Sequence, residues 1–317
     1  MLVTIGAFDG FHKGHAELLR LCRDNARGDD WGVVTFEPHP SLFMGRLHPL
    51  FTLREREIIR RFLGIPNMYV LRFDDSLMNL SPAKFWHLLR SRLNVDGLVM
   101  GSDFRFGHGR EGCAQSLAQL ARNDGITRII IADVVDKPRY SSSTVRENIT
   151  IGNISLAADI LGYPFFMLSR VIHGSARGRT MHFPTANLEL KGGRVIPAYG
   201  VYSAAVLVNG AWHCGALSVG NNPTFHDVTG TRAEVHILDF DGDIYGEEVM
   251  MLLLGRVRGI ETFTDKEALT AQIGHDTEEC RKIYREVMSR EDTQSFTKSA
   301  RQYISHETIT PEIINLT

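Results

Sequence analysis

The apolar pattern of this 317-residue chain changes its period near the middle, and that change constrains the fold more than any other feature. In the first half, short apolar runs typical of buried strands alternate with segments of helical periodicity. Unbroken apolar runs such as residues 128–135 predict strands buried on both faces of a parallel sheet that helices cover. The first half therefore predicts an α/β domain that binds ligands at the carboxyl ends of its strands.

From about Val171 the pattern changes to apolar strands separated by turn residues. Asn209-Gly210 and Asp241-Gly242 lie between such strands, where tight hairpins place residues of these types. Several short strands with this spacing predict a small closed β-barrel, and the periodicity of residues 266–289 predicts a helix after it. We expect three parts: an α/β domain over residues 1–165, a barrel with a C-terminal helix over residues 166–290, and a polar tail over residues 291–317.

Composition and charge exclude several classes of protein. Hydrophobic residues at 43% and charged residues at 23% are typical of a globular chain, and a net charge of −2 offers no basic excess for nucleic acid. No apolar run approaches the roughly 18 residues that span a bilayer, and Met1 leads into the first strand without an export signal. The four cysteines lack the paired spacing of zinc sites or disulfide frameworks. We expect a cytoplasmic protein that binds neither nucleic acid nor membrane.

A loop rich in glycine and histidine, residues 6–15, lies between the first predicted strand and the first predicted helix. His12 and His15 are three apart, so a helical first turn places both imidazoles on one side, beside free backbone N–H groups. Such a pair can bind a nucleoside triphosphate and stabilise charge on its α-phosphoryl group. Gly10 and Gly14 allow a close backbone approach. Two surface histidines at a glycine turn are the alternative, but the position of the loop favours a nucleotidyl-transfer site.

Two later segments are predicted to contribute to the same crevice. Residues 101–107 follow a predicted strand, and residues 141–146 begin a predicted helix. Hydroxyls at the start of a helix are most often N-caps. Arg146 on the first turn is a better candidate for binding phosphate, because its guanidinium matches phosphate geometry.

A competing motif is the segment 107–112, which satisfies the glycine fingerprint of dinucleotide-binding folds and is followed by Asp133 at about the expected distance. A dehydrogenase is therefore the alternative to nucleotidyl transfer. The fingerprint requires a tight turn from strand to helix, whereas residues 102–106 separate the predicted strand from the first glycine. We therefore prefer nucleotidyl transfer.

The second half carries a set of polar residues at the start of the predicted barrel. A glycine- and arginine-rich segment, residues 174–179, precedes Thr185 and Asn187, which are two apart. In an extended segment their oxygens lie on one side, where they can hold a hydrated Mg²⁺ that bridges ATP phosphates. Glu234 is a carboxylate within an apolar strand. Singly, these features indicate a turn and an outward barrel position, but together they favour phosphoryl transfer.

These motifs together resemble those of the bifunctional bacterial riboflavin kinase/FAD synthetases. The resemblance runs from about Val3 to Arg285 and includes seven segments in one order, which are residues 6–15, 36–40, 101–107, 141–146, 183–187, 222–225 and 233–236. It implies an N-terminal Rossmann-like nucleotidyltransferase domain that adenylylates FMN to FAD with release of pyrophosphate. It also implies a C-terminal β-barrel that phosphorylates riboflavin to FMN.

The resemblance also implies roles for individual residues. His12, His15 and Glu234 would be catalytic, with Glu234 the general base for the ribityl hydroxyl. ATP and flavin in the first domain would contact Gly6, Phe8, Asp9, Gly10, Gly14, Asp103, Ser142 and Arg146. ATP in the barrel would contact Gly174, Gly178, Arg179, Thr185 and Asn187, with Mg²⁺ at Thr185 and Asn187. The expected partners are riboflavin, FMN and ATP, with FMN and FAD as products, for a monomer or weak homo-oligomer.

Three residues depart from the pattern of that family. Ala7 stands where a polar residue is usual, Thr144 where an arginine is common, and His182 where a glycine usually precedes Phe-Pro-Thr-Ala-Asn. The chain also begins almost at the first strand, without the short leader that is usual there. A flavin-binding homologue that retains only one of the two activities is therefore a further alternative.

Overall fold

The computed structural model describes residues 1–133, 140–173, 183–190, 193–221, 231–304 and 313–314. The chain divides into two compact units. One consists of Met1–Ser142 with Thr308–Thr317, and the other of Ser143–Glu307. Among the described helices, none is long and apolar enough to cross a membrane.

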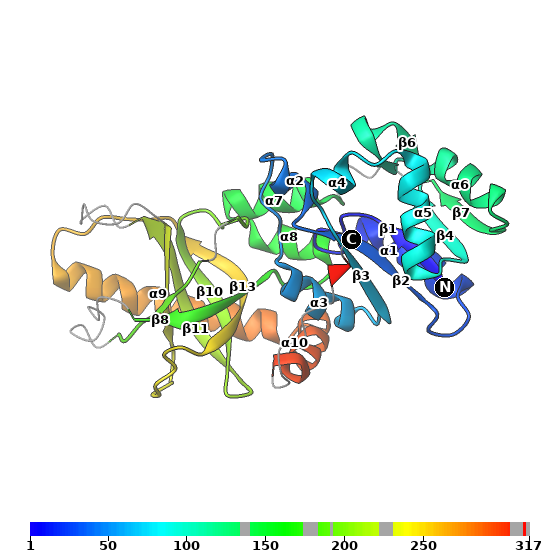
Figure 1. Cartoon of the computed structure of the whole chain (residues 1–317). Helices are drawn as coiled ribbons and strands as arrows, with labels where there is room; N and C mark the ends of the chain where they lie inside the picture. Colours follow the sequence, from blue (N-terminus) through cyan, green and yellow to red (C-terminus); the bar gives the residue numbers. More distant parts are fainter. Residues whose placement is uncertain (134–139, 174–182, 191–192, 222–230, 305–312, 315–317) are drawn as a thin grey trace. The chain divides into compact units, whose positions relative to one another are not determined.

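The first unit is built on a six-stranded sheet in the order β14-β3-β2-β1-β4-β7 (Figure 1), and every neighbouring pair is parallel. The strands are β1 (Leu2–Ile5), β2 (Trp31–Glu37), β3 (Asn67–Arg72), β4 (Gly97–Gly101), β7 (Arg128–Ala132) and β14 (Ile313–Ile314). The predicted parallel sheet is confirmed. The strand order reverses between β1 and β4, and sheets of this kind bind ligands beyond the carboxyl ends of such a pair.

The helices of the first unit begin and end at residues that favour helix termini. They are α1 (Ala16–Asn25), α2 (Pro40–Phe43), α3 (Leu53–Phe62), α4 (Asp75–Met78), α5 (Pro82–Leu93) and α6 (Ala114–Asn123), with the short 3₁₀ helices η1 (Lys13–His15) and η2 (His108–Arg110). Thr52 and Glu55 form a capping box at the start of α3. Ser81 caps α5, which ends at Asn94 in the left-handed conformation.

A continuous apolar core joins the sheet to these helices. β1, β2 and β4 contribute Val3, Ile5, Val34, Leu98 and Met100, and α5 and α6 contribute Trp86, Leu89, Leu117 and Ala121. β1 and β4 are buried at every position, as expected for central parallel strands. This packing gives the carboxyl ends of β1 and β4 a rigid support.

The second unit contains a closed antiparallel barrel in the order β10-β11-β12-β9-β8-β13. Its strands are β8 (Phe166–Ile172), β9 (Ala186–Leu188), β10 (Gly200–Val208), β11 (Ala211–Asn221), β12 (Thr231–Ile237) and β13 (Glu248–Arg258). Asn209 and Gly210, both with positive φ, form the tight turn between β10 and β11. The predicted barrel is confirmed.

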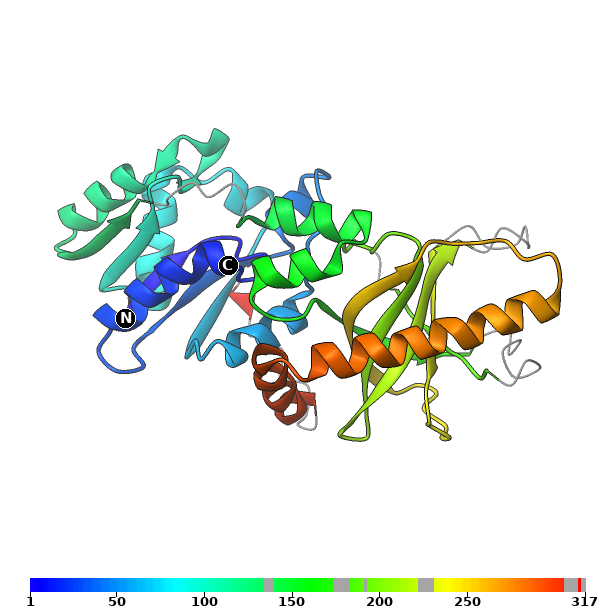
Figure 2. The same cartoon turned by 180° about the vertical axis from the view of Figure 1, so that it is seen from behind.

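Among the described residues, four helices belong mainly to the second unit: α7 (Ser142–Ile151), α8 (Ile154–Leu161), α9 (Lys266–Met288) and α10 (Glu291–Ile304). α9, where the sequence predicts a helix, packs against β10, β11 and β13 (Figure 2). α10 is an element that the sequence did not predict. Its Phe296 is fully buried, stacks on Tyr163 with ring centroids 5.4 Å apart, and makes a tilted contact with Phe166 at 5.3 Å.

Candidate active sites

The loop of residues 6–15 follows β1 at the point where the strand order reverses, and it holds three residues in the left-handed region. These are Phe8 (φ 44°), Gly10 (φ 88°) and Phe11 (φ 42°). Left-handed backbone at a bulky residue costs free energy and persists only where the surroundings impose it. Here the buried rings of Phe8 and Phe11 stack 5.3 Å apart and hold the loop in place.

His12 and His15 lie together, with ring centroids 3.9 Å apart and ring planes 26° from parallel. His12 is 6% exposed, and its Nδ1 accepts a hydrogen bond from the backbone N–H of Gly14 at 3.1 Å. The neutral ring of His12 therefore carries its proton on Nε2. His15 Nδ1 is buried and has no hydrogen-bond partner among the residues that the structure describes. The pair thus offers ring nitrogens that a ligand can satisfy.

Burial keeps both imidazoles uncharged at neutral pH. It lowers the pKa of His12 from 6.5 to about 4. Burial, and next the neighbouring His12, lower the pKa of His15 well below 6.5. Two neutral rings can stack without mutual repulsion, and each can donate an N–H to an anion.

Gly14 leaves no space for a side chain. A Cβ there would contact the backbone oxygen of Tyr140 and would lie 2.9 Å from the ring of His12. Any other residue at this position would displace the His12 ring or the segment at Tyr140. The glycine is therefore part of the geometry that places the two histidines.

Asp9 and Ser142 lie in the framework of this loop. Asp9 is 2% exposed, and its Oδ1 accepts a hydrogen bond from the backbone N–H of Leu50 at 2.9 Å. The Ser142 hydroxyl donates to the backbone oxygen of Asp9 at 2.8 Å. Gly6 continues from β1, and its N–H donates to the oxygen of Val34 at 3.0 Å. These contacts set the path of the backbone that carries the histidines.

Two other predicted site residues lie on other elements. Asp103 is exposed and follows β4, the neighbour of β1, so it stands at the same edge of the sheet. Arg146 is half-buried on α7, in the second compact unit.

The dinucleotide fingerprint at residues 107–112 lies in a different structural setting. The segment connects β5 (Arg105–Phe106) to β6 (Gly112–Cys113), which form a separate two-stranded antiparallel hairpin. The fingerprint acts where a strand of the parallel sheet turns directly into a helix. The dehydrogenase interpretation is therefore wrong.

The barrel brings together three of the polar residues predicted for it. Asn187 on β9 is paired in register with Glu234 on β12. The Thr185 hydroxyl, just before β9, donates to Glu234 Oε2 at 3.4 Å. Glu234 is half-buried and alternates with the buried residues Ala233 and Val235, so it lies on the outward face of its strand. Three oxygen-bearing side chains therefore stand on one face of two paired strands.

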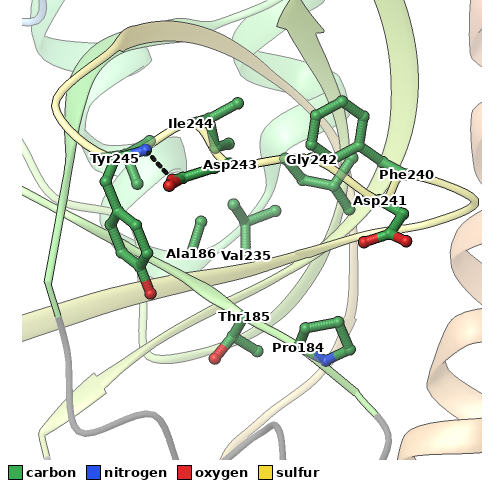
Figure 3. A pocket seen from close by; sticks show the side chains of 12 residues that line it. Pro184, Thr185, Ala186, Val235, Phe240, Asp241, Gly242, Asp243, Ile244 and Tyr245 are labelled. Atoms are coloured by element: carbon green, nitrogen blue, oxygen red, sulfur yellow. Dashed lines mark hydrogen bonds between the residues drawn. The ribbon is translucent and has the colours of Figure 1, made fainter.

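Thr185, but neither Asn187 nor Glu234, lines a cavity of about 370 Å³, which is within the usual size range of small-molecule sites. Figure 3 shows Pro184 and Thr185 on one side of it and the loop of residues 240–245 on the other. The Tyr245 N–H donates to Asp243 Oδ1 at 3.0 Å, and His173 stacks on the Tyr245 ring at 4.1 Å. The apolar lining of the cavity includes Val171, Ala186, Val235, Ile237, Phe240 and Ile244. The sequence did not predict that the loop of residues 240–245 lines a cavity, although Asp241-Gly242 indicated a turn there.

Several predicted residues lie outside the described part of the chain. These are Gly174, Gly178, Arg179 and His182, together with the segment 222–225.

A parallel sheet with paired histidines at its strand-order reversal, followed by a barrel with a group of oxygen-bearing side chains near a cavity, is the arrangement expected of a two-site nucleotide-using transferase. Comparison with known proteins agrees. A family model described as FAD synthetase matches residues 1–145, and one described as riboflavin kinase matches residues 161–284.

Curated relatives match across both units. The bifunctional riboflavin kinase/FMN adenylyltransferase of Listeria monocytogenes is 35% identical over 291 residues, covering 89% of this chain and 92% of the relative. The Escherichia coli K12 protein of the same name is 36% identical over 296 residues, with the same coverage. A crystal structure described as a macrolide-efflux protein from Streptococcus pneumoniae is 34% identical with a TM-score of 0.78, and the match covers 88% of this chain and 93% of that one.

The chain belongs to the bifunctional riboflavin kinase/FMN adenylyltransferase family. It is an ATP-using enzyme whose two activities together produce FAD. The resemblance noted from the sequence motifs is confirmed.

Proposed function

We propose that the first unit transfers the adenylyl group of ATP to FMN at the loop of residues 6–15. We propose also that the barrel transfers the γ-phosphoryl group of ATP to riboflavin beside Thr185, Asn187 and Glu234. The observation that most directly supports the first assignment is the stacked pair of neutral imidazoles at the carboxyl end of β1. The second is supported by the Thr185 to Glu234 hydrogen bond at the edge of the cavity.

In adenylyl transfer, an FMN phosphate oxygen forms a bond to the α-phosphorus of ATP, and the bond to the bridging oxygen of the leaving pyrophosphate breaks. His12 donates from Nε2, because its Nδ1 already accepts from Gly14. His15 supplies a second ring nitrogen. Donors fixed before the reaction stabilise the charge that develops on the phosphoryl oxygens and on pyrophosphate.

In phosphoryl transfer, the ribityl hydroxyl oxygen of riboflavin forms a bond to the γ-phosphorus of ATP, and ADP leaves. Glu234 accepts the hydroxyl proton as that bond forms. The Thr185 hydroxyl donates to the Glu234 carboxylate and orients it. Register pairing with Asn187 keeps the carboxylate on the same face as the Thr185 and Asn187 oxygens.

The residues of this cluster fit Mg²⁺, which binds oxygen ligands and is usually held by a few protein groups together with substrate phosphates and water. Thr185 and Asn187 would hold it through a hydroxyl and an amide oxygen. Among the described residues, no group of three or more His, Cys, Asp or Glu side chains forms a metal cage, so ATP would supply the remaining ligands. The ion would offset the negative charge on the β- and γ-phosphate oxygens.

The cavity suits the base of the ATP consumed by the kinase. Its apolar lining can enclose a flat ring, and Thr185 at one side places the phosphates toward Asn187 and Glu234. We also place the enzyme in the cytoplasm, because its four cysteines are free thiols in the described part of the chain.

Positional labelling of ATP tests both assignments in the intact protein. With riboflavin and Mg²⁺, label at the γ-phosphorus should appear in FMN. With FMN, label at the α-phosphorus should appear in FAD, while label at the γ-phosphorus leaves as pyrophosphate. Absence of either labelled product would remove the corresponding assignment.

A further inference from the structure

Arg56 on α3 is a buried arginine that the proposed chemistry does not use. Its side chain is 1% exposed, although arginine is almost never buried unless it is paired. Burying a guanidinium carries a large desolvation cost, which only good partner geometry offsets. Its contacts therefore indicate what the arginine does.

The guanidinium binds the carboxyl end of β2 at three points. Nη1 donates to the Thr35 hydroxyl at 3.0 Å. Nη1 and Nη2 both donate to the backbone oxygen of Phe36, at 3.2 and 3.1 Å. Nη2 also pairs with the Glu37 carboxylate. A forked guanidinium can satisfy three partners at once, whereas a lysine ammonium is a single point of charge.

Thr35 extends these contacts to the histidine-bearing loop. Its hydroxyl, which accepts from Arg56, donates to the backbone oxygen of Ala7 at 2.9 Å. Thr35 is fully buried, so water does not compete for these bonds. The buried carboxylate of Asp9, in the same loop, lies within electrostatic range of the guanidinium. A chain of hydrogen bonds therefore runs from α3 through β2 to the loop.

We propose that Arg56 is a positioning residue of the adenylyltransferase site. It acts through Thr35 and the Ala7 carbonyl to fix the loop in the left-handed path that brings His12 and His15 together. The inference rests on the proposed role of this loop in adenylyl transfer. It follows that removal of the Arg56 guanidinium lowers the turnover number for FAD formation more than it weakens the binding of ATP and FMN.

The same helix provides a matched control. Arg60, one turn further along α3, also pairs with a carboxylate, that of Glu57. Its Nη1 donates to the backbone oxygens of Ile65 and Pro66, just before β3, and none of these groups belongs to the loop. Arg56→Met and Arg60→Met each remove a forked hydrogen-bond donor from α3. Only Arg56→Met breaks the chain of hydrogen bonds that leads to the loop of His12 and His15.

The experiment measures FAD formation from FMN and FMN formation from riboflavin in the full chain. Arg56→Met should lower turnover for FAD formation about 10- to 100-fold, with KM for ATP and FMN within about threefold. Arg56→Lys should fall between the wild type and Arg56→Met. Arg60→Met should keep FAD turnover within about twofold, and riboflavin phosphorylation should be unchanged in all variants. Thr35→Val should lower FAD turnover much less in the Arg56→Met variant than in the wild type, because both residues act through the same chain of hydrogen bonds.

Equal FAD turnover in folded Arg56→Met and Arg60→Met variants would overturn the role of Arg56. If Arg56→Met does not fold, Arg56→Lys combined with Thr35→Val gives the same comparison. Variants at His12 and His15 separate this result from the parent assignment. If they retain FAD formation, the proposed function of the loop fails, whereas if they lose it and Arg56→Met does not, only the positioning role fails.

Discussion

Asn187 and Glu234 occupy directly opposite positions on β9 and β12, so the two strands hold an amide and a carboxylate on one face of the barrel wall. Such pairs have Cβ atoms about 5 Å apart, and their relative position is set by strand pairing rather than by a flexible loop. The spacing of the amide and the carboxylate is therefore set by the barrel itself.

Glu234→Gln tests the general base at this position. The amide cannot accept the hydroxyl proton, so riboflavin kinase turnover should fall by about 10²- to 10⁴-fold with little change in KM for ATP. Steady-state rates with riboflavin and Mg-ATP measure it. Glu189→Gln, at an exposed carboxylate just after β9, is the control and should keep full activity. Unchanged turnover in Glu234→Gln would leave Glu234 a structural residue and make Asp243, on the cavity wall, the next candidate.

The two chemistries should be separable in one chain. His12→Ala combined with His15→Ala removes both ring donors of the first unit and should abolish FAD formation from FMN. Riboflavin phosphorylation should stay within a few-fold, because its residues lie in the other unit. His87→Ala, at an exposed histidine of α5, should change neither rate. Equal loss of both activities in a folded double variant would contradict the assignment.

His12 should make the folded state sensitive to acid. Burial lowers its pKa from 6.5 to about 4, so between these values the unfolded chain binds more protons than the folded one. Stability is therefore lost as pH falls through this window, by about 3 kcal/mol at pH 4 for this residue. His12→Asn keeps an acceptor for the Gly14 N–H and removes the titration. In thermal unfolding, the stability of His12→Asn relative to the wild type should rise as pH falls. A stability difference that does not change with pH would mean that the pKa of His12 is not shifted.

The four thiols should differ in reactivity. Hydrogen bonds from the Ser116 backbone and hydroxyl lower the pKa of Cys113, at the start of α6. Burial raises the pKa of Cys22 and Cys280 to about 12 and that of Cys214 to about 11. Because the thiolate is the reactive form, iodoacetamide near neutral pH should label Cys113 first. Mass spectrometry of digested protein identifies the site. Labelling of Cys214 before Cys113 would contradict the order.

Phe296 should account for much of the attachment of α10. Its ring is fully buried against Tyr163 and Phe166, so Phe296→Ala should lower the free energy of unfolding of the second unit by about 3 to 5 kcal/mol. Lys298→Ala, at an exposed position of the same helix, should have almost no effect. Denaturant unfolding followed by circular dichroism makes the comparison. A cost below about 1 kcal/mol for Phe296→Ala would mean that the helix is held elsewhere.

Local sequence signals predicted much of the fold because the local chemistry determined it. Asn209-Gly210 indicated a hairpin, and both residues take the positive φ that such a turn requires. The unbroken apolar runs indicated strands buried on both faces, which is correct for β1 and β4. It is wrong for residues 128–132, because β7 is an edge strand and is only half-buried. The histidine spacing indicated that His12 and His15 lie on one side of a helical turn, and a tight 3₁₀ turn does bring their rings together. Their role in a nucleotide site stays a prediction.

Features that depend on distant partners were not predictable in this way. Glu55, Arg56 and Glu57 form a charged run typical of a solvent-exposed helix face, yet all three are buried. Arg56 is buried because it binds residues of β2. The periodicity of α3 does not reveal that contact. α10 escaped prediction because its buried stripe is short and half polar, with Thr293 and Thr297 beside Phe296 and Ala300.

The shortest strand of the first sheet, β14, is synthesised after the barrel, and this affects the sheet while the chain is being made. Ile313 and Ile314 pair with Val70 and Leu71 of β3, so β14 covers one edge of a sheet whose other strands all precede the barrel in the chain. A ribosome completes β3 long before it reaches β14. Throughout synthesis of the barrel, the N–H and C=O groups of β3 that later face β14 remain open, and an open strand edge can pair with another nascent chain.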